Sequence, residues 1–337
     1  MRFLIKPLLL LAFVTNKHLN LSDAHRLEVH KWIEHSRPEN TVTTYSRYGK
    51  QYMDFAVANN LPLEDPYTLA SMMKHGLEDR GLGRSTLTSV LPSAVAHLFR
   101  YSDETPTQHP VVREAKKTVM RLTSPSKQKL PVTPAQLVRI AATIKRNKFI
   151  HVRDMFMMTL MFLGFLRESE VTQLKPENVW EETIDGEAVL FIFVVKAKND
   201  QFSTGHTIVL GGDATSPICP IKWHRLYRRF AKGKHLFYKA NNRARAGLAK
   251  TTPNAIIKKL LRTINVDPEP YGSHSLRRGG VTAAVAAGVD ILVLARHGNW
   301  HSEAIYAYVS QSVFQRLGVS RSILHSPLQG PESKFMY

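Results

Sequence analysis

The stretch AVLFIFVVKAKNDQFSTGHTIVL, residues 188–210, decides the fold. Its two ends are rich in β-branched and aromatic residues, which is typical of strands. The middle, KAKNDQFSTG, is rich in turn-forming residues. The pattern therefore predicts a β-hairpin, and because helical periodicity returns on both sides, the hairpin is expected to project from a mainly helical domain.

Helical segments surround this hairpin. Before it, Thr133 and Pro134 form an N-cap and first-turn pair for a helix to about Arg146, followed by the helical patterns RDMFMMTLMFLGF and ESEVTQL. After it, further helices are indicated by SPICPIKWHRLYRRFAK, TPNAIIKKLLRTI, LRRGGVTAAVAAG and the region of Trp300. We therefore expect a second domain that is mainly α with a small β-sheet.

The stretch LTSPSKQKLPVTP, residues 122–134, has proline and serine but no apolar periodicity, and predicts an interdomain linker over 124–132. Residues 22–123 precede it and have the pattern of a small helical bundle, whose first helix carries four aromatic residues on one face between positions 45 and 55. Residues 133–337 form the second domain and a C-terminal tail. Two domains agree with a length of 337 residues.

Residues 1–21 begin with MRFLIKPLLLLAFVT, where basic residues precede an apolar run, as in a signal peptide. Pro7 interrupts the run, no small-residue cleavage site follows, and the run is too short to span a bilayer. We expect an N-terminal extension of a chain that is not secreted. The single cysteine, Cys219, excludes an internal disulfide and a cysteine-based zinc site, and fits a reducing compartment.

The chain is strongly basic: 46 Lys and Arg against 27 Asp and Glu leave a formal charge of +19. Such a charge attracts polyanions, of which nucleic acid is the commonest in a cell. The positive charge favours a nucleic-acid partner. The alternative interpretation is that the charge only keeps the protein soluble.

Several motifs bearing cations and tyrosines follow one another in the second domain. They are RESE with Arg167 and Glu170, the hairpin with Lys196 and Lys198, HSLR with His274 and Arg277, and GNWHSEAIYAYV with Trp300, Tyr306 and Tyr308. In order and approximate spacing the set resembles the active site of the tyrosine recombinases, of the phage-integrase type. SHSLRRGG and G-x-W-x-S are most similar to recombinases of eukaryotic mobile elements, the DIRS and Crypton types.

The resemblance implies the fold and the partners. It implies an N-terminal helical core-binding bundle and a C-terminal α+β catalytic domain that together clamp double-stranded DNA. It further implies a homo-tetramer on DNA and a monomer or dimer when free. The apolar positions of SVFQRLGVSRSIL, after Tyr308, are expected to dock either on a neighbouring protomer or on their own chain.

Two arginines are assigned to the scissile phosphate by the resemblance, Arg167 and Arg277. Arginine suits this role because its guanidinium stays charged and can hold two oxygens at once. Arg167 follows an apolar helix and a Gly-Phe-Leu turn, so it is expected at a helix start near the surface, where backbone N–H groups favour an anion. Glu170, one turn later, is expected to orient Arg167 or to cap the helix. Arg278 is expected to contact solvent or the DNA backbone.

Three further side chains complete the expected site. His274 precedes Arg277 by one helical turn, so both can face one ligand, and its pKa near neutrality suits proton transfer. Trp300 can donate its indole N–H to a phosphate oxygen. Lys198, in a Lys-Asn-Asp-Gln turn that resembles the Lys-Thr-Asp-Gln turn of mobile-element relatives, is expected to protonate the leaving 5′-hydroxyl, with Lys196 as the alternative.

The nucleophile is Tyr308 or Tyr306. A phenol attacks only when a base takes its proton or cations stabilise its anion. Relatives with G-x-W-x-S place the tyrosine eight residues after the tryptophan, which selects Tyr308. A bacterial-type register aligned on IYAYV selects Tyr306.

The resulting hypothesis is a site-specific DNA recombinase or integrase that acts through a covalent 3′-phosphotyrosine. The alternatives are a domesticated DNA-binding protein without turnover and a topoisomerase-like DNA relaxase. No cofactor and no metal are expected: His297 and His301 lie four apart, but no Glu or Cys nearby completes a ligand set. We expect a nuclear location in a eukaryotic cell and otherwise a cytoplasmic or nucleoid one, without a membrane partner.

Overall fold

The structure is a computed structural model that describes residues 27–30, 32–33, 36–102, 104–125, 128–195, 205–240, 245–300 and 305–306. The chain divides into two compact units, residues 1–127 and 128–337. The expected linker spans this division. Its last residues belong to the second unit, because the backbone N–H groups of Leu130 and Val132 donate to the carbonyls of Pro270 and Ser275 at 2.9 Å each.

The first unit is helical. Its elements are α3 (Glu39–Ala58), α4 (Pro66–Glu78), the π-helical turn η2 (Thr86–Val90), α5 (Leu91–Leu98), the 3₁₀ turn η3 (Pro106–Gln108) and α6 (Pro110–Leu122). The pattern STLTSVLPSAVAHLFRY predicts one helix over the region of η2 and α5. It is widened to a π turn just ahead of Pro92, which has no N–H to continue the α-helical ladder.

The aromatic face of α3 is only partly core. Tyr52 is fully buried, and its hydroxyl donates to the Leu63 carbonyl at 2.6 Å. Tyr45 and Tyr48 are half-buried and lie under the guanidinium groups of Arg37 and Arg47, respectively. The prediction of a helical face is confirmed, but only its C-terminal half enters the core.

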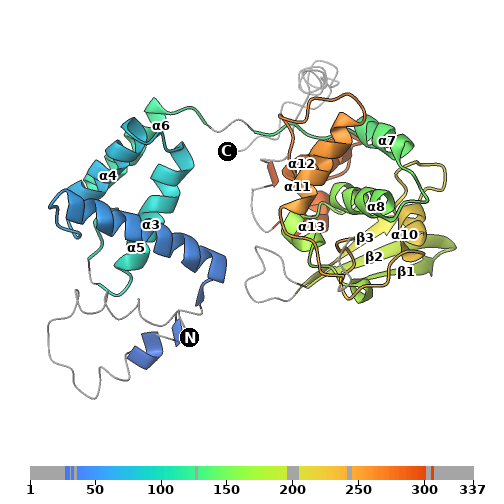
Figure 1. Ribbon diagram of the computed structural model, residues 1–337, viewed down its shortest axis with the longest axis horizontal. Helices are drawn as coiled ribbons and strands as arrows, with labels where there is room; N and C mark the ends of the chain where they lie inside the picture. The colour runs from blue at the N-terminus through green and yellow to red at the C-terminus, as the bar shows by residue number, and fades with distance from the viewer. Residues whose placement is uncertain are drawn as a thin grey trace, which may run out of the picture. The chain divides into compact units, whose positions relative to one another are not determined.

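The second unit is mainly helical with one small sheet. Its elements are α7 (Pro134–Thr143), α8 (Phe149–Leu163), α9 (Glu168–Val171), the 3₁₀ turn η4 (Pro176–Asn178), β1 (Val179–Ile184), β2 (Glu187–Val194), β3 (His206–Gly211), α10 (Pro220–Arg228), α11 (Thr252–Arg262), α12 (His274–Ala286) and α13 (Ile291–His297). The N-cap of α7 is confirmed at Thr133, which forms a capping box with Gln136. Both units are drawn in Figure 1.

The predicted hairpin is part of a three-stranded antiparallel sheet in the order β1-β2-β3. The sequence prediction missed β1, VWEETI, because three of its six residues are polar and carry little strand signal. Its register places Trp180 opposite Phe191 and Ile192 opposite Val179.

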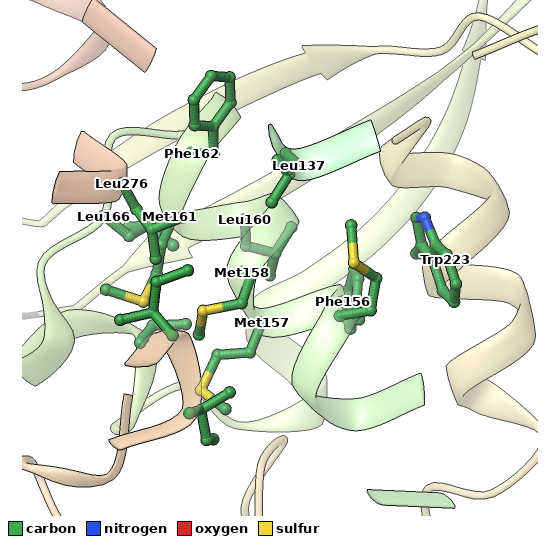
Figure 2. Close-up of a cluster of buried hydrophobic side chains, with 14 of the residues drawn as sticks. Leu137, Phe156, Met157, Met158, Leu160, Met161, Phe162, Leu166, Trp223 and Leu276 are labelled. Carbon is green, nitrogen blue, oxygen red and sulfur yellow. The ribbon is translucent and has the colours of Figure 1, made fainter. Parts of the chain in front are cut away.

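Helix α8 is the centre of the second unit. All of its residues from Val152 to Phe162 are buried, which is typical of a helix that is surrounded by other elements. Figure 2 shows its side chains between Leu137 of α7, Trp223 of α10 and Leu276 of α12. The core thus holds α12 directly against α8. None of the helices in the described ranges is long and apolar enough to cross a membrane.

Candidate active site

Three segments that are far apart in the sequence meet at Arg277. Its Nη1 donates to the carbonyl of Phe165, in the turn after α8, and its Nη2 donates to the carbonyl of Gly298, after α13, at 2.9 Å. The guanidinium carbon lies 3.8 Å from the centroid of the Trp300 ring. Only 1% of Arg277 is exposed. The charge of this arginine is therefore held at a fixed place.

The two glycines of SLRRGG explain how α12 reaches this position. A methyl group at Gly279 would overlap the Val132 carbonyl oxygen, and one at Gly280 would overlap the Phe162 carbonyl oxygen. Two glycines in a helix lower its intrinsic stability. Here Gly280 lets the backbone of α12 approach that of α8, and Gly279 lets it approach the backbone of Val132, ahead of α7. Because Arg277 lies one turn before Gly280, this close approach brings the guanidinium to the end of α8.

The sequence GNW forms a tight end to α13. The Trp300 N–H donates to the Ala295 carbonyl at 2.8 Å and the Asn299 N–H donates to the Arg296 carbonyl at 3.1 Å, which is a Schellman motif. The motif requires a left-handed residue, and Asn299 has φ +52°, a conformation that asparagine tolerates well. A side chain at Gly298 would overlap the Trp300 ring. The turn thus folds the indole back under Arg277.

Arg167 lies two residues after Phe165, so its backbone is within about 7 Å of the residue that binds Arg277. It is the N-cap of α9. The Glu170 carboxylate accepts from the Arg167 backbone N–H at 2.8 Å and from its Nη1 at 2.6 Å. Both expectations for Glu170 are confirmed, since it orients the guanidinium and caps the helix. The sequence predicts that the start of this helix favours an anion, and in the structure the Glu170 carboxylate occupies that position.

Arg167 is less exposed than the expected position near the surface suggests. Only 11% of the Arg167 side chain is exposed, and Arg277 is buried deeper still. His274, the first residue of α12, is exposed. His274 therefore lies at the surface, whereas Arg277, one helical turn later, lies inside. The sequence predicts that both side chains face one ligand.

Arg278 is half-buried and makes contacts within the chain that the sequence did not predict. Its Nη1 donates to the Lys129 carbonyl at 3.3 Å, and its Nη2 donates to Gln128 Oε1. These bonds tie the start of the second unit to α12. The sequence missed this role because a contact between segments 149 residues apart leaves no local signal.

His297 is a further part of the site that the sequence did not identify as such. Its Nε2 lies 2.9 Å from the Leu163 carbonyl oxygen and its ring meets Phe165 edge-on. Burial lowers the pKa of His297, and the nearby charge of Arg277 acts in the same direction. A neutral imidazole next to the buried guanidinium avoids repulsion between two cations. His301, the histidine four residues later that was considered with His297 as a metal ligand, is outside the described residues.

Asn299 also connects the site to the sheet. Its Nδ2 lies 3.3 Å from Nδ1 of His206, the first residue of β3. The hairpin lysines Lys196 and Lys198 are outside the described residues, so the structure does not distinguish between them. Within the described ranges, no group of three His, Cys, Asp or Glu side chains is placed to hold a metal ion.

Of the two tyrosines, Tyr306 is described and 61% exposed, next to Ile305, which is buried in a small cluster with Trp300 and Phe165. Tyr308 is outside the described residues. The choice between the two nucleophiles therefore stays a prediction.

The chain combines a helical unit with a second unit in which a small antiparallel sheet accompanies helices, and in this second unit Arg277 and Trp300 meet. These features are typical of the class of tyrosine recombinases. The phage integrase family model matches residues 131–312, which is more than half of the chain, and the chain belongs to this family. The prediction of family and fold class is confirmed.

The similar proteins include recombinases and integrases. An "Integrase/recombinase xerD homolog" of Selenomonas ruminantium is 23% identical over 340 residues, 95% of this chain and 96% of the relative. Among solved structures, the Tn1549 transposon integrase in complex with circular intermediate DNA has a TM-score of 0.59 at 14% identity, over 87% of this chain and 97% of that one. The XerH site-specific recombinase bound to palindromic difH substrate has a TM-score of 0.54 at 17% identity, over 77% and 72%.

Proposed function

We propose that the protein is a site-specific DNA recombinase that cuts and rejoins DNA strands through a covalent 3′-phosphotyrosine. The observation that carries the proposal is the buried, fixed guanidinium of Arg277, bonded to the turn that leads to Arg167 and stacked on Trp300. A phosphodiester resists attack because its oxygens are negative, and cations that are already in place stabilise the charge of the transition state.

In the proposed reaction the Tyr308 phenol oxygen attacks the scissile phosphorus. A bond forms between that oxygen and phosphorus while the bond from phosphorus to the 5′ oxygen breaks. His274 accepts the phenol proton, and Lys198 protonates the departing 5′-hydroxyl. Arg167, Arg277 and Trp300 are assigned to the nonbridging phosphate oxygens. Because Arg277 and Trp300 are buried in the free chain, direct contact with the phosphate requires that DNA binding expose them. Rejoining is the reverse reaction, and since the energy of the phosphodiester is kept in the phosphotyrosine, no cofactor is required.

Double-stranded DNA is the proposed partner. The formal charge of +19 supports this, and several similar structures contain DNA, including the lambda integrase dimer bound to a COC′ core site at a TM-score of 0.53. Exchange between two duplexes requires four cleaved strands, which favours a homo-tetramer on DNA. The protein would act where the DNA is, in the nucleus of a eukaryotic cell or otherwise in the nucleoid.

The test uses a nicked duplex, from which the cleaved fragment diffuses away so that the covalent adduct is trapped. The duplex is prepared as a pool of randomised sequences, and the sequences recovered in adducts identify the target site. The wild type is expected to form a covalent protein–DNA adduct, and Tyr308→Phe to form none. Tyr306→Phe is the matched control, since it removes a phenol oxygen from the tyrosine two residues earlier. Mass spectrometry of the adduct identifies the modified tyrosine. Lys198→Ala and Lys196→Ala are compared in the same way.

Three results would contradict parts of the proposal. An adduct on Tyr306 would reassign the nucleophile. DNA binding without any adduct would favour a DNA-binding protein without turnover. Relaxation of a supercoiled plasmid that lacks the selected site would favour a topoisomerase-like relaxase.

A further inference from the structure

Strand β3 passes close to the end of α8, just before the residue that binds Arg277. A methyl group at Gly164 would lie 3.5 Å from the Ile208 side chain, and Ile208 is buried. Successive side chains of a strand alternate between its faces, so His206 and Ile208 lie on the same face of β3. His206, the first residue of β3, is therefore on the side of the sheet that meets the end of α8.

His206 is joined to the turn after α13. Nδ2 of Asn299 lies 3.3 Å from Nδ1 of His206, and both residues are half-buried. An amide nitrogen can only donate, so the imidazole Nδ1 accepts. Asn299 stands between Gly298, whose carbonyl accepts from Arg277, and Trp300. Since the Trp300 ring stacks on the same guanidinium, the Asn299 side chain connects β3 to two of the groups that hold Arg277.

His206 also marks the base of the hairpin. In the register of the sheet it lies opposite Val194, the last residue of β2. Gly205 has φ +71°, and a side chain there would overlap an aromatic ring of β2, so the chain enters β3 in a conformation that favours glycine. Lys196 and Lys198 follow Val194 by two and four residues, which is at most about 14 Å of chain. The place of the hairpin base therefore limits where either lysine can reach.

We propose that Asn299 and His206 are positioning residues that hold the hairpin's proton donor in register with Arg277. The inference rests on the proposed function and deepens it. A general acid must come within about 2.6–3.2 Å of the oxygen that it protonates, and a misplacement of about 1 Å can slow a reaction about 100-fold. Neither residue is assigned to the reacting atoms. Their hydrogen bond fixes the base of the hairpin against the turn that holds the guanidinium.

The experiment compares two leaving groups on the selected target duplex. One nicked duplex keeps the scissile 5′ oxygen, and in the other this oxygen is replaced by sulfur. Attack of the phenol oxygen on phosphorus then breaks a phosphorus–sulfur bond and releases a thiolate. A thiol has a pKa of about 8.5, so it leaves without a proton donor, whereas a 5′-hydroxyl needs one. Sulfur therefore repairs a misplaced proton donor but does not repair weakened binding of the phosphate.

Asn299→Gly removes the amide and keeps the left-handed turn, because glycine adopts positive φ without strain. Relative to the wild type on the same duplex, we expect single-turnover adduct formation to slow about 10- to 100-fold with oxygen and less than about threefold with sulfur. His206→Leu is expected to behave in the same way, and the double variant to be no slower than either single variant. His206→Asn is expected to keep most of the wild-type rate, since its amide oxygen can accept in place of Nδ1.

Asn265→Gly is the matched control. Asn265 follows α11 in the same left-handed conformation, with φ +56°, and is exposed. This variant is expected to react at the wild-type rate with both duplexes. Lys198→Ala and Lys196→Ala are measured alongside, because the one that sulfur repairs is the proton donor and shows how large the repair can be.

The rates can overturn the proposal in two ways. Equal losses with oxygen and with sulfur would mean that the contact supports Arg277 or the fold and not the proton donor. Unchanged rates in Asn299→Gly and His206→Leu would mean that the contact does not affect cleavage.

Amide hydrogen exchange of the full chain without DNA tests the connection independently of cleavage. The N–H groups of Asn299 and Trp300 are hydrogen-bonded within the turn, and His206→Leu is expected to speed their exchange about fivefold, as for the loss of one hydrogen bond. Unchanged exchange would overturn the connection. If the exchange is faster but the wild type forms no adduct with either duplex, the proposed function fails, and with it the role of the proton donor, while the connection between the two segments stands.

Discussion

At the scale of single residues, Arg277 is the most constrained side chain of the site. Burying a charged group costs several kcal/mol unless partners replace its water. Here two backbone carbonyls and the face of Trp300 do so. The partners come from three segments, and the arginine therefore joins those segments as well as carrying charge. A lysine at 277 could not make both bonds and stack on the ring at once.

Gly298→Ala tests whether the position of Trp300 matters. The new methyl group would overlap the indole ring, so Trp300 must leave the Arg277 guanidinium. We expect adduct formation to slow by about 100-fold, which is typical of losing one fixed donor at a transition state. The measurement is the single-turnover rate on the nicked duplex. Gly211→Ala is the control, because a methyl group there has no atom within 4 Å. Equal rates for both variants would mean that the packing of Trp300 does not affect cleavage.

His97 in the first unit gives a prediction for pH. Burial, with Arg100 and Arg37 nearby, lowers the pKa of His97 from 6.5 to about 4. The unfolded chain therefore binds a proton between these values that the folded chain does not, and stability falls as the pH falls through this window. Denaturant unfolding of the full chain at pH 7 and pH 5 measures the loss, which is expected to be smaller in His97→Gln. If His97→Gln lost as much stability as the wild type between pH 7 and pH 5, the loss could not be attributed to His97.

At the scale of elements, the contact between α12 and α8 places the site. Gly280 allows the backbones of α12 and α8 to meet, and Gly279 allows α12 to meet the backbone of Val132. On the same helix, Arg277 binds the turn after α8 and Arg278 binds the start of the unit. The short segment SLRRGG thus combines glycines that allow close backbone contact with two arginines that hydrogen-bond to other segments. The clustering of glycines and arginines in SLRRGG follows from this geometry.

Gly280→Ala is expected to separate these helices. The added methyl group would overlap the Phe162 carbonyl oxygen, and backbone cannot move aside as a flexible side chain can. Overpacking of this kind typically destabilises by about 1–3 kcal/mol, although alanine favours a helix over glycine by about 1 kcal/mol. Denaturant unfolding measures the net change. A more stable variant would show that α12 can shift without loss.

At the scale of the whole molecule, the sequence predicted more of the elements than of their contacts. The apolar run of α8 and the N-cap of α7 were visible because both are local signals. Strand β1 was missed because half of its six side chains are polar. The burial of Arg277 was equally invisible, since its partners are the carbonyls of Phe165 and Gly298 and every residue has a carbonyl. The motif could suggest which residues are functional but not which of them face solvent.

The charge of +19 belongs to the whole chain, and it predicts how binding responds to salt. A protein that neutralises about 6–10 phosphates releases a similar number of condensed cations, so its affinity for DNA falls by about 10³–10⁵ between 50 and 200 mM salt. Fluorescence anisotropy with a labelled duplex measures this slope. Sucrose at matched osmolality is the control, because it changes water activity without supplying ions. A fall of less than tenfold would mean that the basic residues are spread over the surface without converging on DNA.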